Sequence, residues 1–246
     1  MKARARSVVF YAGLAPMTVL FSLIGIGILP LPRTVRYAVI TRWSVLTIHW
    51  LRICCGLGYT VRGLEHVTST AGVIVCKHQS AWETIALQLI FPRQCQVLKR
   101  ELLRVPFFGW GLASLNPIAI DRNAGTRALK RVLQLGAERL QDGWWVLLFP
   151  EGTRVPPGTR GRYTQTGAAL ALASGRPLIP VAHNAGVFWA RNALTKYPGT
   201  IEVVIGPPID LAGKSAKAVI REAEEWIEAT CATLPLTPAQ ADANAG

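Results

Sequence analysis

The most regular feature of the chain is an unbroken apolar run near its beginning. Ser7 to Leu31 covers 25 residues, in which the phenol of Tyr11 is the only acid or base. As a helix rising about 1.5 Å per residue, such a run is able to cross the ~30 Å hydrocarbon core of a bilayer. It is too long for the apolar region of a signal peptide, so we expect it to be retained. Pro30-Leu31-Pro32 then predicts a turn, because proline does not continue a helix.

A second helix is predicted directly after this turn. Its apolar and aromatic positions recur at helical spacing, at Val39, Trp43, Leu46 and Trp50. Polar residues occupy the opposite side of the helical wheel, at Arg42, His49 and Arg52. Indole rings and arginines suit the headgroup level of a membrane, so the two segments predict a re-entrant hairpin that docks in the membrane surface. The alternative is an ordinary buried helical hairpin.

The rest of the chain alternates short apolar runs with amphipathic helical stretches, which is typical of α/β proteins. The predicted strands are Tyr59–Arg62, Val73–Cys76, Gln94–Leu98, Pro117–Ile120, Trp145–Phe149, Leu178–Val181 and Ile201–Ile205. Several are continuous apolar runs, which favours a mostly parallel central sheet flanked by helices. The clearest helices are predicted over Ala124–Gln141 and Ser215–Cys231. We therefore expect a helical hairpin over residues 1–57, an α/β domain over residues 58–234 and a loose tail over residues 235–246.

Composition narrows the class of partner. The 246 residues include 27 Lys and Arg against 14 Asp and Glu, a net charge of +13, which predicts nucleic acid, a lipid headgroup or a phosphorylated substrate as the partner. Eight Lys or Arg and no acidic residue precede Glu65, so this charge gathers around the apolar hairpin. No base-stacking platform is readable, and an anionic membrane surface is favoured over nucleic acid. Five cysteines without a C-x-x-C pair indicate reduced thiols in a cytosol-facing compartment.

A histidine and a carboxylate follow the strand predicted to end at Cys76. If His78 lies in the loop and Glu83 in the first turn of the next helix, the carboxylate accepts from one ring nitrogen and raises the basicity of the other. His78 is therefore a candidate general base. The same glutamate also fits a capping box with Ser80 at the N-cap, in which it only holds the helix end. No Gly-x-Ser-x-Gly elbow supplies a nucleophile, and Cys76 is better explained as a core residue.

Neither a metal nor a bound cofactor is predicted. The histidines are scattered along the chain, at His49, His66, His78 and His183. No His-Glu-x-x-His pattern and no cluster of Cys and His accompanies them.

A second group of candidate residues lies in the segment Phe149–Arg154, which reads Phe-Pro-Glu-Gly-Thr-Arg after a predicted strand. Glycine lets backbone N–H groups approach an oxyanion, threonine adds a hydroxyl donor, and the guanidinium of Arg154 matches phosphate with two donors. The alternative is a plain β-turn. Arg160 and Arg162 follow in the same loop, Arg122 ends another strand, and Lys99 offers a further cation.

Four blocks in this order resemble the glycerophospholipid acyltransferase family. His78–Glu83 resembles the family's His-x4-Asp catalytic block, and Asn116–Arg122 resembles its second block, which ends in arginine. Phe149–Arg154 matches the third block almost letter for letter, and Leu178–Val181 resembles the fourth. The resemblance covers roughly Tyr59–Pro208, and the apolar hairpin resembles the membrane-docking element of bacterial members.

The resemblance implies roles for the candidate residues. His78 would be the general base, oriented by Glu83. The acceptor phosphate would be bound by Arg122 and Arg154, with Lys99 as a further cation, Glu151 and Gly152 shaping the site, Thr153 donating a hydroxyl, and the fourth block lining the acyl side. Two departures stand out: Glu83 occupies a position usually held by aspartate, and Lys77 one where asparagine is frequent. The longer glutamate keeps the carboxylate and changes only its reach.

The implied activity is acyl transfer from a thioester to the sn-2 hydroxyl of 1-acyl-glycerol-3-phosphate. The acyl donor is left open between acyl carrier protein and coenzyme A thioesters. A cytosolic donor requires a membrane protein whose active site lies on the cytoplasmic face. Two alternatives are kept, namely another lysolipid acceptor, such as a lyso-ornithine lipid, and a non-catalytic module that binds anionic lipid.

Overall fold

A computed structural model describes residues 2–238 of the chain, without the side chain of Arg122. The helices are α1 (Lys2–Gly27), α2 (Arg33–Cys55), α3 (Trp82–Ile90), α4 (Phe108–Ser114), α5 (Thr126–Gln141), α6 (Thr166–Ser174), α7 (Ala185–Phe188) and α8 (Ala216–Thr233), with short 3-10 turns η1 (Leu64–His66), η2 (Arg100–Arg104) and η3 (Arg122–Ala124). The strands are β1 (Leu57–Arg62), β2 (Val73–Cys76), β3 (Gln94–Lys99), β4 (Ile118–Ile120), β5 (Trp145–Leu148), β6 (Leu178–His183) and β7 (Gly199–Ile205). Most of the tail expected after residue 234 lies outside the described residues.

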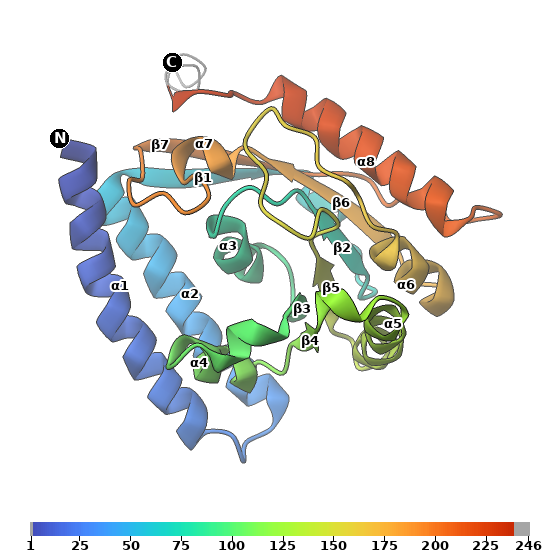
Figure 1. The fold of residues 1–246 in the computed structure, drawn as a ribbon, viewed down its shortest axis with the longest axis horizontal. Helices are drawn as coiled ribbons and strands as arrows, with labels where there is room; N and C mark the ends of the chain where they lie inside the picture. The colour runs from blue at the N-terminus through green and yellow to red at the C-terminus, as the bar shows by residue number, and fades with distance from the viewer. Residues whose placement is uncertain (1, 239–246) are drawn as a thin grey trace.

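All seven strands join one sheet in the order β1-β7-β6-β2-β5-β3-β4 (Figure 1). Every neighbouring pair is parallel except β6 and β7, which pair antiparallel. Each predicted strand is present to within two residues at its ends, and the largest differences are in β1, β6 and β7, which each gain two residues at one end. The mostly parallel α/β class is therefore confirmed.

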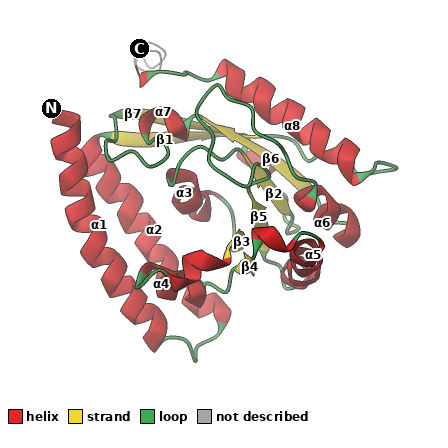
Figure 2. Ribbon diagram, viewed as in Figure 1, coloured by secondary structure: helices red, strands yellow, loops and turns green. Residues whose placement is uncertain are grey.

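The sheet separates two hydrophobic cores. Successive strand side chains point to opposite faces, so Ile74 and Cys76 pack toward α2 and α3, whereas Val73 and Val75 pack toward α5, α6 and α8. All four side chains are fully buried. Figure 2 shows helices on both faces of the sheet. The continuous apolar runs of the sequence thus reflect burial from two sides.

The N-terminal helices α1 and α2 form an antiparallel pair beside the sheet, joined by a turn around Pro30 (Figure 1). α1 is the one helix of the described chain that is long and apolar enough to cross a membrane. Two indole rings of α2 are held against α1. Trp43 donates to the Thr18 hydroxyl at 3.2 Å and Trp50 donates to the Phe10 carbonyl at 3.1 Å. Both rings are half-buried, and their place at the headgroup level stays a prediction.

Three neighbouring parallel strands, β6, β2 and β5, end at the same edge of the sheet. Carboxyl ends of parallel strands are a common place for binding sites in α/β proteins. His183 is the last residue of β6, and the loops after β2 and β5 carry His78 and Glu151. The topology therefore brings together residues that are more than a hundred positions apart in sequence.

Candidate active site

The centre of the site is the loop between β2 and α3. His78 Nδ1 lies 2.8 Å from Glu83 Oε1, and the same oxygen accepts the backbone N–H groups of Gln79 at 2.9 Å and Ser80 at 2.8 Å. The glutamate therefore orients the histidine and also holds the backbone just before α3. The N-cap predicted for this helix is wrong, because Ala81 and not Ser80 occupies that position.

The hydrogen bond to Glu83 fixes which nitrogen of His78 is basic. Because Nδ1 donates its proton to the carboxylate, Nε2 carries the free lone pair. The ring is nearly buried and stacks on Phe149 with 4.1 Å between centroids. Burial alone raises the pKa of Glu83, but His183, His78 and the Ser80 N–H group outweigh it and lower this pKa below its ordinary value. Glu83 is thus ionised at neutral pH.

A second histidine lies behind this pair. His183 Nδ1 accepts the Ala185 N–H group at 3.1 Å, so its Nε2 carries the proton and donates to the Lys77 carbonyl at 2.9 Å. Nε2 is also 4.0 Å from Glu83 Oε2, which is buried without a hydrogen-bond partner among the described residues. Burial lowers the pKa of His183, which keeps its ring neutral. In the sequence, this histidine was one of four scattered ones, and its place directly after an apolar strand was the only signal.

Lys77 fixes the loop between β2 and α3 to other parts of the chain. Its ammonium group donates to Glu151 Oε1 at 2.8 Å, to Glu228 Oε1 at 2.7 Å and to the Thr159 carbonyl at 2.9 Å. The side chain is 1% exposed. Burial lowers the pKa of Lys77, but the hydrogen bonds from the two carboxylates outweigh it and raise the pKa above its ordinary value. The departure at position 77 is therefore part of a buried ion triad that ties α8 to the site.

Glu151 connects this triad to the catalytic loop. Its Oε2 accepts the His78 backbone N–H group at 2.8 Å, while Oε1 accepts from Lys77 and from the Gly161 N–H group at 3.3 Å. Both oxygens are thus bound within the chain. Burial raises the pKa of Glu151 and Lys77 only partly offsets this effect. The arrangement accords with a residue that shapes the site, as the resemblance implies.

The turn after β5 carries the candidate anion donors. Gly152 has a φ of +65°, which glycine adopts without strain, and Thr153 is exposed. The Val155 N–H group donates to the His78 carbonyl at 2.9 Å, so the turn is fixed to the catalytic loop. Arg154 lines the cavity that also contains His78, and its Nε is buried without a partner among the described residues. This guanidinium is therefore available for a ligand.

Lys99 and Arg122 belong to neighbouring strand ends. Lys99 is the last residue of β3, pairs with Ile120 of β4, and has a side chain 47% exposed, 3.7 Å from Glu101. Arg122 begins η3 two residues after β4. Its backbone position is near Lys99, and its side chain lies outside what the structure describes.

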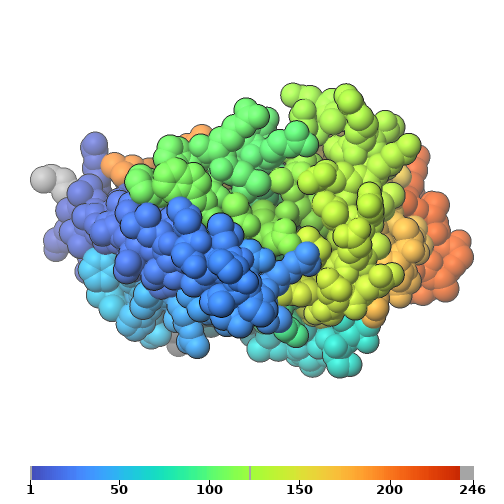
Figure 3. Space-filling view, turned by 90° about the horizontal axis from the view of Figure 1, so that it is seen from below, coloured from blue at the N-terminus to red at the C-terminus, as the bar shows by residue number. Residues whose placement is uncertain are grey.

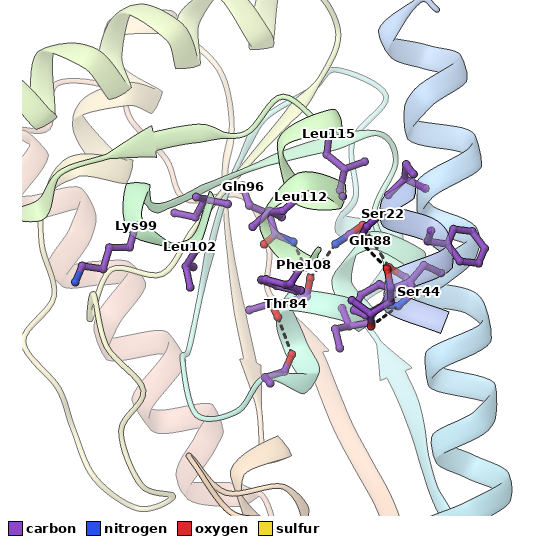
Figure 4. A pocket seen from close by; sticks show the side chains of 18 of the residues that line it. Ser22, Ser44, Thr84, Gln88, Gln96, Lys99, Leu102, Phe108, Leu112 and Leu115 are labelled. Atoms are coloured by element: carbon purple, nitrogen blue, oxygen red, sulfur yellow. Dashed lines mark hydrogen bonds between the residues drawn. The ribbon is translucent and has the colours of Figure 1, made fainter. Parts of the chain in front are cut away.

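A cavity of about 310 Å³ extends from His78 and Arg154 between the N-terminal helices and the α/β domain. Figure 4 shows its labelled side chains, among them Gln88, Gln96, Leu112 and Leu115. Gln88 and Gln96 both donate to the Thr84 carbonyl, at 3.0 and 2.7 Å, so these polar groups are largely satisfied within the wall. A mostly apolar cavity whose wall also carries His78, Lys99 and Arg154 fits an amphiphilic ligand.

The fourth block of the sequence lies elsewhere. Leu178–Val181 forms the buried first part of β6 in the centre of the sheet and is not among the residues that line this cavity. Its side chains are buried in the two cores, and its contact with the acyl side stays a prediction. Within residues 2–238, no group of three or more His, Cys, Asp and Glu side chains is arranged to hold a metal.

Comparison with known proteins gives a consistent result. A family model described as Acyltransferase matches residues 58–184. A 1-acyl-sn-glycerol-3-phosphate acyltransferase of Pseudomonas aeruginosa is 45% identical over 93% of this chain and 91% of its own length, and the human beta form is 26% identical over 87% and 78%. The crystal structure of the LPA acyltransferase PlsC from Thermotoga maritima has a similar fold, with a TM-score of 0.75, 21% identity, and coverage of 94% of this chain and 95% of that one.

Proposed function

Since this chain belongs to the acyltransferase family, we propose that it moves a fatty acyl group from a thioester to the sn-2 hydroxyl of 1-acyl-glycerol-3-phosphate, giving phosphatidic acid. The relatives' printed activity supports this acceptor. The observation that carries the chemistry is the hydrogen bond between His78 Nδ1 and Glu83 Oε1 at the end of a cavity that also holds Arg154.

In the proposed mechanism, His78 Nε2 takes the proton of the acceptor hydroxyl while the oxygen attacks the thioester carbonyl. Glu83 stabilises the imidazolium that forms. When the tetrahedral intermediate collapses, the C–S bond breaks and the imidazolium returns its proton to the leaving thiolate. The thioester brings an already activated acyl group, so the step requires no cofactor and no covalent enzyme intermediate.

Binding of the acceptor is assigned to the cations around the cavity. Arg154, Arg122 and Lys99 are proposed to hold the phosphate, with Thr153 as a hydroxyl donor and Gly152 and Glu151 shaping the turn. Positioning of the hydroxyl near His78 supplies much of the rate in such a reaction. The apolar part of the cavity is proposed to hold an acyl chain.

The donor is proposed to be an acyl carrier protein or coenzyme A thioester that arrives from the cytosol. α1 is proposed to keep the protein at a membrane surface, with the His78 site on the cytoplasmic face. Salt-sensitive attachment to anionic lipid is expected from the net charge of +13.

The test measures incorporation of labelled acyl groups from each donor into the lysolipid by purified protein. Wild-type protein is expected to make phosphatidic acid, and His78→Ala to lose at least ~100-fold in kcat, the usual contribution of a general base. His78→Ala with near wild-type turnover would reject the base. Product from a lyso-ornithine lipid but not from the phosphate-bearing acceptor would reject the acceptor and keep the mechanism.

A further inference from the structure

We propose that the segment 100–110 is a second membrane-contacting surface, which docks on anionic phospholipid and opens the cavity to the bilayer. The proposal rests on the proposed function only in one respect, which is the identity of the lipid that enters the active-site cavity. Its apolar part, here called the 102–110 ridge, consists of Leu102, Val105, Phe107, Phe108 and Trp110. It was not predicted from the sequence, where only the N-terminal hairpin was assigned to the membrane.

The ridge exposes large apolar side chains that the chain itself does not cover. Its members are between 38% and 43% exposed, although they lie within nine consecutive residues. The rings of Phe107 and Trp110 lie tilted against each other, with 4.9 Å between centroids and 58° between planes. Contiguous exposed apolar groups of this kind mark an interaction surface, because single exposed residues would be scattered over the molecule.

The backbone of the ridge gives an independent indication. Phe107 has a φ of +60° and a ψ of −68°, a conformation that side-chain-bearing residues rarely adopt. Such strain costs on the order of 1–3 kcal/mol and is usually found at functional sites. Here the strained residue carries an aromatic ring that is still 38% exposed. A partner outside the chain would supply the missing burial.

The position of α4 connects the ridge to the apolar face of α1. Small residues allow close packing: a Cβ on Gly111 would lie 3.1 Å from Ser22 Oγ, and one on Gly25 would lie 3.2 Å from Ser114 Oγ. The exposed apolar side chains of α1 include Leu20, Leu23 and Ile26. Figure 3 shows green atoms from this part of the chain beside the blue N-terminal helices on one face of the molecule. The ridge and the exposed apolar side chains of α1 therefore belong to neighbouring elements.

The charged residues around the ridge indicate which kind of lipid it contacts. Exposed Lys99, Arg100 and Arg104 border the ridge, with Glu101 as the one acidic residue in this stretch. Aromatic rings for the interface and cations for phosphate oxygens are the combination found on proteins that lie on anionic bilayers. We therefore assign the surface to anionic phospholipid.

The ridge also lies at the wall of the active-site cavity. Leu102 and Phe108, both labelled in Figure 4, line this cavity together with His78, and they are 40% and 38% exposed. The same side chains therefore belong both to the ridge and to the cavity wall. An acceptor held in the bilayer by its own chain would reach His78 past these two residues without leaving the apolar phase.

The test uses the tryptophans of the full chain. Trp110 is exposed, whereas the other seven are buried or half-buried. Vesicles of phosphatidylglycerol with brominated acyl chains, without substrate or donor, are expected to quench part of the tryptophan emission. Trp110→Phe should lose more than half of that quenching. Equal quenching of both proteins, or none of either with a dimer in solution, would overturn the proposal, the latter indicating an interface between copies.

A matched pair of leucine variants controls for non-specific hydrophobic binding to vesicles. Leu102→Ser is expected to weaken vesicle binding about tenfold, as for loss of one buried leucine side chain. Leu236 is 46% exposed and follows α8, outside the ridge and α1, so Leu236→Ser should bind as the wild type does. Equal binding by both variants would overturn the proposal. Because no turnover is measured, an inactive protein with quenched Trp110 would reject only the proposed function.

Discussion

The two sides of the His78 cavity are built in opposite ways. Behind the histidine, Lys77, Glu151 and His183 are nearly or fully buried, and most of their polar atoms find partners within the chain. On the other side, α1 and the 102–110 ridge expose apolar side chains that the chain leaves uncovered. The polar groups of the first side are paired within the folded chain. The apolar side chains of the second side are covered only when another apolar phase contacts them.

The difference follows from desolvation. A buried charge is stable only when its partners are fixed, which makes the rear wall rigid and places His78 accurately. An exposed apolar surface costs free energy in water and gains it on contact with lipid. Substitutions behind the histidine should therefore change stability and kcat, whereas those in front should change membrane binding.

The largest expected effect is that of Lys77→Met. Removal of the ammonium leaves Glu151 and Glu228 facing one another without a cation, and breaking a buried pair from one side costs about 3–5 kcal/mol. Chemical unfolding at pH 7 measures this loss. Lys214→Met is the matched control, because Lys214 also bonds a glutamate at 2.7 Å but lies at the surface. Equal unfolding free energies of the two variants would show that the buried triad contributes no more to stability than a surface ion pair.

The pH dependence of the same variant has a defined sign. The pKa of Lys77 is raised above 10.5, so its contribution is complete below that pH and is lost as the pH rises through the folded-state pKa. The wild-type advantage over Lys77→Met should therefore be constant from pH 7 to 9 and decrease only in more alkaline solution. An advantage that declines already between pH 7 and 9 would contradict the assignment.

The next effect is on catalysis, in Glu83→Gln. The amide is uncharged and no longer stabilises the imidazolium, so kcat should fall at least ~100-fold while the acceptor KM changes little. Glu83→Asp should recover part of the activity, since it keeps the charge and loses only reach. Equal activity of the Gln and Asp variants would assign the residue to helix capping alone.

Stability of this variant should also depend on pH. The lowered pKa of Glu83 means that its stabilisation is present above the unfolded value of 4.5 and is lost as the pH falls through the folded-state pKa. The difference in unfolding free energy between wild type and Glu83→Gln should shrink below about pH 4.5. Urea unfolding at pH 7, 5 and 4 measures it, and a difference that grows on acidification would reverse the sign.

What the sequence predicts depends on the range of the interaction. Strands β2 and β5 were found because each is a short apolar run, and the His78–Glu83 pair because its members are five residues apart. Glu228 gave no signal, since it reaches Lys77 across 151 positions through the packing of α8. The bond from Trp43 to α1 was not predicted, because periodicity identifies an apolar face without saying whether lipid or another helix covers it.

A moderate effect is expected at Arg154, whose Nε is buried without a partner among the described residues. Arg154→Lys keeps the charge but not the planar pair of donors, so the acceptor KM should rise roughly tenfold with a smaller change in kcat. Steady-state kinetics with varied lysolipid measure the split. An unchanged acceptor KM would exclude this arginine from phosphate binding.

The smallest effect is expected at Arg160, which the sequence offered as a further anion donor. Its guanidinium bonds Glu224 of α8 at 2.7 Å and is largely exposed, so it is already engaged on the far side of the catalytic loop from the ridge. Exposed pairs of this kind contribute little. Arg160→Ala should leave the KM for either acyl donor within about twofold and the vesicle affinity unchanged, as kinetics and vesicle sedimentation would measure. A severalfold rise of the KM for acyl carrier protein alone would contradict this expectation and would indicate that the donor docks on α8. The side of the molecule behind His78 would then also bind a partner.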